Sequence, residues 1–292
     1  MSDDSVASRY RLSSTIELRN GALMPRIHLG VWESNGAVCE TAVRAALECG
    51  YRAVDTAEWY ENEAEVGAAI RAFLASPAAA ATGLQRRDIW FTTKLRANVG
   101  YEETREAIRR SRRTSGLPRL DLYLLHSPYG GREKRLECWR AVEDAMAEGE
   151  VGTGGVSNFG LTHLRELVDA QPRVLPAVNQ IEVNPFNTRR ELTSFCQEHG
   201  IVVQAYSPLA KAWRMQHPKI LELAQRYSCS PAQLLIRWSL QHDFVPLPKS
   251  ANKERIRANG QLEGFDIGQD DMKVLDGLDE YLITDWDPTN TE

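Results

Sequence analysis

Short runs of apolar residues alternate along this chain with longer stretches in which apolar residues recur every three or four positions. The runs begin near residues 27, 51, 89, 120, 151, 177, 201 and 244, and they are continuously apolar, as parallel strands covered on both faces are. The periodic stretches are typical of amphipathic helices and cover residues 37–49, 63–75, 103–114, 132–147, 161–169, 190–199 and a longer region over 218–240. Eight strand–helix units over roughly 230 residues match the size of a TIM barrel. The pattern therefore predicts an α/β fold, a (β/α)8 TIM barrel.

The segment before the first run has a different pattern. Over residues 15–25, alternating side chains flank an Asn20-Gly21 pair, which is the strongest short-range signal for a β-hairpin. We expect this N-terminal β-hairpin to close the bottom of the barrel. Residues 1–14 are polar and predict a flexible tail. No linker rich in Pro, Gly or Ser divides residues 15–292, so we expect one domain.

A doubly wound nucleotide-binding fold is the competing interpretation. Residues 149–155 read GEVGTGG and are rich in glycine. The dinucleotide fingerprint, however, is G-x-G-x-x-G, and it joins a first strand to a helix. The glycines here lie in mid-chain and do not follow that spacing, so the barrel is favoured.

Composition and charge narrow the class of protein. The 292 residues carry a formal net charge of −5, which provides no basic surface for nucleic acid or membrane. The arginines within residues 109–113 lie in a helical pattern and predict a solvated helix face.

The five cysteines form no C-x-x-C pair and the six histidines never pair at ligand spacing, so we expect reduced cysteines and no metal. No apolar run has the length of a bilayer span, and the first residues do not resemble a secretory signal. We therefore expect a cytoplasmic protein, and because the sequence offers no clear oligomer interface we expect a monomer.

Ionisable residues follow three neighbouring strand runs. Asp55 ends the run at 51 and precedes Tyr60 by five positions, Lys94 ends the run at 89, and His126 ends the run at 120. Because the carboxyl ends of barrel strands meet at one rim, we expect these four side chains to converge.

This set of residues suits delivery of a proton to a carbonyl group. A free tyrosine has a pKa near 10, and a neighbouring lysine ammonium favours its ionised form. A carboxylate such as Asp55 would keep the lysine charged, and His126 could donate a hydrogen bond to a carbonyl oxygen. The alternative is a structural ion pair between Asp55 and Lys94, with Tyr60 as a wall residue and His126 as a rim histidine. Nucleophilic catalysis is not indicated, because the sequence has neither a G-x-S-x-G motif nor a cysteine paired with a base.

Seven motifs, in this order, resemble the aldo-keto reductase superfamily: DTAEWYENEAEVG, FTTKL, LDLYLLHSP, GVSNF, VNQIEVNP, AYSPLA and PKSANKERIRAN. The resemblance runs from about residue 15 to the C-terminus, and it implies a (β/α)8 barrel that reduces carbonyl groups with NAD(P)H. It also implies roles for the four rim residues. Tyr60 would be the general acid, Lys94 would lower its pKa, Asp55 would pair with Lys94, and His126 would orient the substrate oxygen.

The same resemblance implies a cofactor site. Ser157, Asn158 and Gln180 match the residues that hold the nicotinamide carboxamide. Tyr206 matches the aromatic residue that stacks on the nicotinamide ring. Ser207 and Leu209 fall in the loop that wraps the pyrophosphate.

The end of the chain bears on the choice of cofactor. Two cations and a hydroxyl within seven residues, Lys249, Ser250 and Arg255, suit a phosphate monoester, so we expect NADPH/NADP+ rather than NADH. Asn259 resembles the adenine contact of the family. Ala258 departs from the Glu or Gln of many relatives at the adenine.

The substrate side is expected to be apolar and aromatic. Trp32 follows the first strand and Trp59 precedes Tyr60, so we expect both to line the pocket with His126. Trp286 lies in the C-terminal segment, which often folds over the rim in relatives. Ser127 stands where many members of the superfamily have a tryptophan, so one aromatic wall is missing. Short rim loops predict an open mouth and broad tolerance of small aldehydes and ketones.

Two readings of the function follow. The favoured one is NADPH-dependent, reversible reduction of aldehydes and ketones to alcohols, with tyrosine as the general acid. The alternative is a regulatory or structural barrel that binds NADP(H) with little turnover. A barrel lyase or isomerase is disfavoured because the context for a metal or Schiff base is missing.

Overall fold

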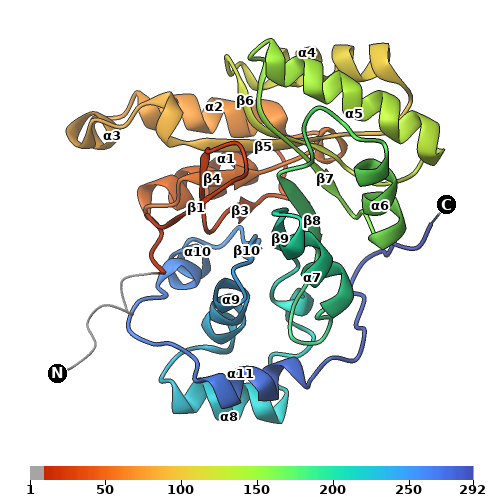
Figure 1. The fold of residues 1–292 in the computed structure, drawn as a ribbon. Helices are drawn as coiled ribbons and strands as arrows, with labels where there is room; N and C mark the ends of the chain where they lie inside the picture. The colour runs from red at the N-terminus through yellow and green to blue at the C-terminus, as the bar shows by residue number, and fades with distance from the viewer. Residues whose placement is uncertain (1–9, 292) are drawn as a thin grey trace.

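A single barrel of parallel strands organises the molecule. The computed structural model describes residues 10–291 and contains eight strands hydrogen-bonded side by side in chain order (Figure 1). Their bounds are β3 Leu29–Gly30, β4 Ala53–Asp55, β5 Trp90–Leu95, β6 Leu120–Leu125, β7 Val151–Ser157, β8 Val178–Glu182, β9 Val202–Tyr206 and β10 Val245–Pro246. The last and first strands also meet, because a parallel bridge joins Gly30 to Lys249 and the backbone N–H of His28 donates to the carbonyl of Pro246 at 3.2 Å. The predicted (β/α)8 barrel is confirmed.

Helices surround this sheet. They are α1 Gly36–Glu48, α2 Glu63–Leu74, α3 Pro77–Thr82, α4 Tyr101–Ser115, α5 Gly131–Ala147, α6 Leu161–Asp169, α7 Arg190–Glu198, α8 Pro218–Arg226, α9 Pro231–Gln241, α10 Lys253–Gly260 and α11 Gln269–Asp276, with short 3-10 turns η1 Glu58–Tyr60, η2 Arg86–Asp88 and η3 Ala210–Ala212. The helical region expected over 218–240 is two helices. Ser228 has a left-handed φ of 51°, Ser230 caps α9, and Pro231 occupies its first turn. These residues end one helix and start another although the apolar period continues.

The N-terminal hairpin consists of β1 Thr15–Glu17 and β2 Leu23–Pro25, paired antiparallel. Met24 is fully buried against Val178 and Val245, the first residues of β8 and β10. The hairpin therefore covers the end of the barrel where the strands begin, as the sequence predicted.

The packed part of the chain begins before the hairpin. Tyr10 is only 5% exposed and belongs to the main apolar core, and the guanidinium of Arg237 lies 4.8 Å from the centre of its ring. Leu12 packs on the same core. The flexible tail predicted for residues 1–14 is therefore wrong for these two residues, and residues 1–9 lie outside the described part of the chain.

Two tryptophans lie inside a strand and a helix rather than in the rim loops. Trp238 in α9 is 1% exposed and lies among the largest fully buried side chains. Trp90, the first residue of β5, is half-buried and packs against the smaller apolar cluster beneath the barrel. Its position at the start of a strand explains the partial exposure.

The C-terminal segment after α11 passes α7 and reaches α6 (Figure 1). Backbone N–H groups of Glu280 and Leu282 donate to the carbonyl of Phe186, at 3.1 and 2.9 Å. Near its end the segment lies directly on Gly160, where an added Cβ would be 1.9 Å from the carbonyl oxygen of Thr289. Only glycine allows the two backbones to approach this closely.

Candidate active site

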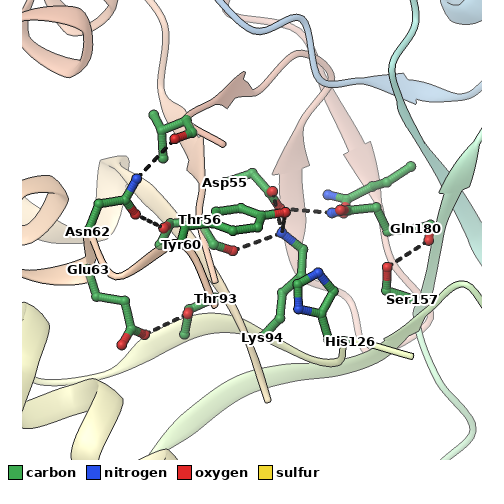
Figure 2. Close-up of polar contacts among 12 residues, drawn as sticks. Asp55, Thr56, Tyr60, Asn62, Glu63, Thr93, Lys94, His126, Ser157 and Gln180 are labelled. Atoms are coloured by element: carbon green, nitrogen blue, oxygen red, sulfur yellow. Dashed lines mark hydrogen bonds and ion pairs between the residues drawn. The ribbon is translucent and has the colours of Figure 1, made fainter. Parts of the chain in front are cut away.

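Three of the predicted rim residues meet around one ammonium group. The Nζ of Lys94, in β5, lies 2.5 Å from the Oδ1 of Asp55, the last residue of β4. It also donates to the carbonyl of Thr56 at 2.8 Å and to the hydroxyl of Tyr60 at 3.4 Å (Figure 2). The parallel register of β4 and β5 brings these residues to the same end of the barrel. The structure therefore brings Asp55, Tyr60 and Lys94 together as the sequence predicted.

Burial and charge oppose each other at this cluster. Lys94 is fully buried and Asp55 is 4% exposed. Burial lowers the pKa of Lys94, but Asp55 and Tyr60 raise it more, so the net shift of its pKa is upward. Burial raises the pKa of the Tyr60 phenol, and the Lys94 ammonium opposes that rise. The ammonium therefore acts on the phenol in the expected sense, while burial outweighs it and the net pKa of Tyr60 lies above 10.

His126 completes the set from the end of β6. Its ring lies 5.7 Å from that of Tyr60, at an interplanar angle of 76°. Burial, with a smaller effect of Lys94, puts the pKa of His126 well below 6.5, so the imidazole is neutral at physiological pH. Nδ1 is buried and has no hydrogen-bond partner among the described residues. The other nitrogen, Nε2, is therefore the one left to donate a hydrogen bond to a substrate oxygen.

A buried asparagine secures the turn that carries Tyr60. Asn62 is fully buried; its amide donates to the carbonyls of Val31 and Ser34, at 2.9 and 2.7 Å, and it accepts a hydrogen bond from the hydroxyl of Thr56 (Figure 2). Through Thr56, whose carbonyl accepts from Lys94, these bonds connect the loop after β3 to the Lys94 ammonium. Asn62 lies within the motif DTAEWYENE, where nothing in the spacing sets it apart from its polar neighbours.

The residues expected at the nicotinamide carboxamide gather at the ends of β7, β8 and β9. Ser157 pairs in register with Gln180, and its hydroxyl donates to the Gln180 carbonyl at 2.9 Å. Asn158 donates to the carbonyl of His126 at 3.0 Å and accepts from the hydroxyl of Tyr206 at 2.9 Å. These bonds join the expected cofactor residues to the backbone of His126. Because the side-chain amide of Gln180 also donates to Asp55 at 2.8 Å, these residues form one polar network with the Lys94 cluster.

Strained backbone marks the loop that follows β9. Ser207, Ala210, Lys211 and Ala212 all have left-handed φ angles, between 46° and 64°, and Leu209 packs partly on the core between them. Such angles are uncommon for residues other than glycine and are frequent at functional sites. This is the loop expected at the pyrophosphate.

The residues expected at a phosphate monoester lie around the start of α10. Lys249 and Arg255 are exposed, and neither forms an ion pair within the described part of the chain. Ser250 is 8% exposed and its hydroxyl accepts from the N–H of Asn252 at 3.1 Å. Two cations without acidic partners beside a helix start fit a dianionic phosphate. Asn259 is 6% exposed, near the end of α10.

The predicted aromatic residues lie at different depths. Trp32 is half-buried, and the ammonium of Lys211 lies 4.6 Å from the centre of its ring. Trp59 is 55% exposed, stacks with Arg96 at 4.1 Å, and donates to the Arg96 carbonyl at 2.8 Å. It thus lies on the outer edge of the rim, and its role as a lining residue stays a prediction.

Trp286 lies closer to the chemistry than either of them. Its ring is 6.3 Å from that of His126, edge to face, and 5.7 Å from that of Tyr129. The segment is held on either side: Thr284 donates to the buried carboxylate of Glu182 at 2.5 Å through its hydroxyl, and Asp287 pairs with Arg189. An aromatic ring therefore stands beside His126 although Ser127 provides none.

Known proteins resemble this chain in sequence and in fold. The aldo/keto reductase family model matches residues 26–280. An uncharacterized oxidoreductase of Schizosaccharomyces pombe is 42% identical over 277 residues, 95% of this chain and 98% of that protein. The glyoxal reductase of Bacillus subtilis is 37% identical over 272 residues, 92% of this chain and 94% of that protein. A crystal structure of the aldo-keto reductase MGS-M4, from a Medee basin deep-sea metagenome library, has a TM-score of 0.88 at 34% identity and covers 95% of this chain and 100% of that one.

The barrel and these matches identify an oxidoreductase built on a (β/α)8 scaffold. The chain belongs to the aldo/keto reductase family. Within residues 10–291, none of the helices combines the length and the apolar character that crossing a membrane requires.

Proposed function

We propose that this chain reduces aldehydes and ketones to alcohols with NADPH, and that the reaction is reversible. The observation that carries the proposal is the position of the Lys94 ammonium between Asp55, at 2.5 Å, and the Tyr60 hydroxyl, at 3.4 Å. A phenol that loses a proton next to a buried cation leaves a stabilised phenolate. Tyr60 can therefore act as an acid toward a carbonyl oxygen.

Each residue of the rim has a defined task in this proposal. Bound NADPH supplies the hydride for the carbonyl carbon. The Nε2–H of His126 holds the substrate oxygen, and Tyr60 donates its proton to that oxygen. Lys94 stabilises the phenolate that results, and Asp55 keeps Lys94 charged. In the reverse direction the phenolate accepts the proton of an alcohol.

The choice of NADPH rests on the exposed cations. Lys249 and Arg255 would contact the 2′-phosphate that NADH lacks, with the hydroxyl of Ser250 between them in sequence. We expect Lys249→Met and Arg255→Met each to weaken NADPH binding by about tenfold to a hundredfold, since charge-assisted hydrogen bonds contribute about 1.5–3 kcal/mol, and to leave NADH binding unchanged. Lys253→Met is the matched control, because Lys253 is an exposed lysine on the same helix as Arg255. An equal loss of affinity for NADPH and for NADH would refute the assignment of these two residues to the 2′-phosphate.

The substrate is proposed to be a small aldehyde or ketone. The loop from β6 to α5 is short, and a relative that is 37% identical is a glyoxal reductase. Oxidation of NADPH across a panel of carbonyl compounds, with glyoxal included and NADH alongside, tests this proposal. A preference of several decades for one large substrate would count against it.

Tyr60→Phe separates catalysis from binding. The variant lacks the proton donor but keeps the ring, so we expect near-complete loss of reduction with an unchanged dissociation constant for NADPH. Wild-type protein that binds NADPH and turns over no carbonyl compound would instead favour the regulatory or structural barrel. The monomeric state and the cytoplasmic location stay predictions from the sequence alone.

A further inference from the structure

A buried glutamine on β9 extends the catalytic network across the barrel. Gln204 is fully buried and stands in register beside Gln180 of β8. The side-chain nitrogen Nε2 of Gln180 donates to two acceptors, the Oδ2 of Asp55 at 2.8 Å and the Oε1 of Gln204 at 2.9 Å. The nitrogen of Gln204 in turn contacts the sulfur of Met24 at 3.4 Å. A chain of polar contacts thus runs from the hairpin to the Lys94 ion pair.

The two acceptors fix the orientation of the Gln180 amide. An amide NH2 group carries two hydrogens, and Asp55 and Gln204 accept one each. Rotating the amide by 180° would place its oxygen against a carboxylate and another amide oxygen, where neither can donate. One hydrogen bond would fix only the position of Nε2, whereas two fix the plane of the amide and the direction of its oxygen. The Oε1 of Gln180 is therefore directed away from Asp55 and Gln204.

We propose that Gln204 is a positioning residue that holds Gln180 as a hydrogen-bond acceptor for the carboxamide N–H of the nicotinamide ring. This inference rests on the proposed function. It gives Gln204 a role in selecting dinucleotides that have an intact carboxamide. It also gives Asp55 a second task, because its two oxygens orient Lys94 and Gln180 separately.

The test compares two dinucleotides by binding rather than by turnover. Dissociation constants are measured by quenching of tryptophan fluorescence for NADP+ and for its 3-acetylpyridine analogue, in which a methyl group replaces the carboxamide nitrogen. One hydrogen bond to a buried acceptor corresponds to about fivefold to tenfold in affinity, so we expect the wild-type protein to favour NADP+ by that factor. In Gln204→Met, which removes the acceptor at similar volume, we expect the ratio to fall to about twofold.

Two further variants make the result decisive. Gln204→Glu keeps an acceptor toward Gln180, so the wild-type ratio should return. Gln225→Met alters an exposed glutamine of α8 and should leave the ratio unchanged. If Gln204→Met does not fold, Gln204→Leu removes the same acceptor and the ratio is measured on it. A wild-type ratio near one, or an unchanged ratio in the variant without the acceptor, overturns the proposal and leaves the proposed function intact. Failure of the wild-type protein to bind either dinucleotide overturns both.

Discussion

Replacement of Lys94 by methionine tests the central electrostatic argument. The Nζ of Lys94 lies 3.4 Å from the hydroxyl of Tyr60. At that distance and an effective dielectric constant of about 20, the attraction between ammonium and phenolate is about 5 kcal/mol. This energy corresponds to a factor of about 10³ to 10⁴ in the population of the phenolate.

Only part of that factor is expressed in the rate, because the proton is partly transferred in the transition state. We expect Lys94→Met to lower kcat for glyoxal reduction by a factor of about 10² to 10⁴, the usual contribution of acid–base catalysis. The dissociation constant for NADPH should change little. The pKa that limits alcohol oxidation should move upward, because the phenolate has lost its cation.

The same variant leaves the Asp55 carboxylate buried without its cation, which costs about 3–5 kcal/mol of stability. The double variant Lys94→Met/Asp55→Asn removes that charge as well. We expect urea unfolding to show recovered stability in the double variant while activity stays low. A folded Lys94→Met protein that keeps a rate within tenfold of the wild type would refute the reasoning, as would recovery of activity in the double variant.

Three further predictions concern other parts of the molecule. Full burial lowers the pKa of His28 to about 3, so the unfolded chain binds a proton below pH 6.5 that the folded chain does not. Between pH 7 and pH 5 this histidine should therefore remove about 2 kcal/mol of stability, and urea unfolding of His28→Gln should lack that part of the pH dependence. Asn62→Leu should lose about 2–4 kcal/mol of stability and also lower kcat, because three buried hydrogen bonds hold the turn that carries Tyr60; equal kcat in the two proteins would contradict this. Trp286→Ala should raise KM for aromatic aldehydes several-fold more than for glyoxal, whereas Trp213→Ala, which alters a 56% exposed ring, should affect neither.

The sequence alone determined the barrel and the identity of the rim residues. Continuous apolar runs separated by amphipathic stretches predict covered parallel strands, and parallel strands all end at the same rim. Asp55, Lys94 and His126 could therefore be assigned to one end of the barrel from their places at the ends of runs. Tyr60 followed from its position in the loop after such a run.

Local sequence signals predicted the structure less reliably where the apolar period continues past a helix end or where a segment has no period. The apolar period over 218–240 continues through the break before α9, and the left-handed Ser228 with the Ser230 cap decides the boundary. Similarly, Tyr10 lies in a polar stretch but is buried, with Arg237 of α9 against its ring. A single aromatic ring in a polar segment gives no period from which its burial could be predicted.

The tertiary structure alone decided which groups complete the site. The carbonyl of Thr56 accepts from Lys94, and every residue has such a carbonyl, so the sequence gives no sign of this contact. Gln180 bonds Asp55 from 125 positions away, and Trp286 reaches His126 from the far end of the chain. Strand register and the path of the C-terminal segment bring these partners together. Contacts between distant residues leave no periodic trace in the sequence, and only the closed barrel shows that they lie side by side.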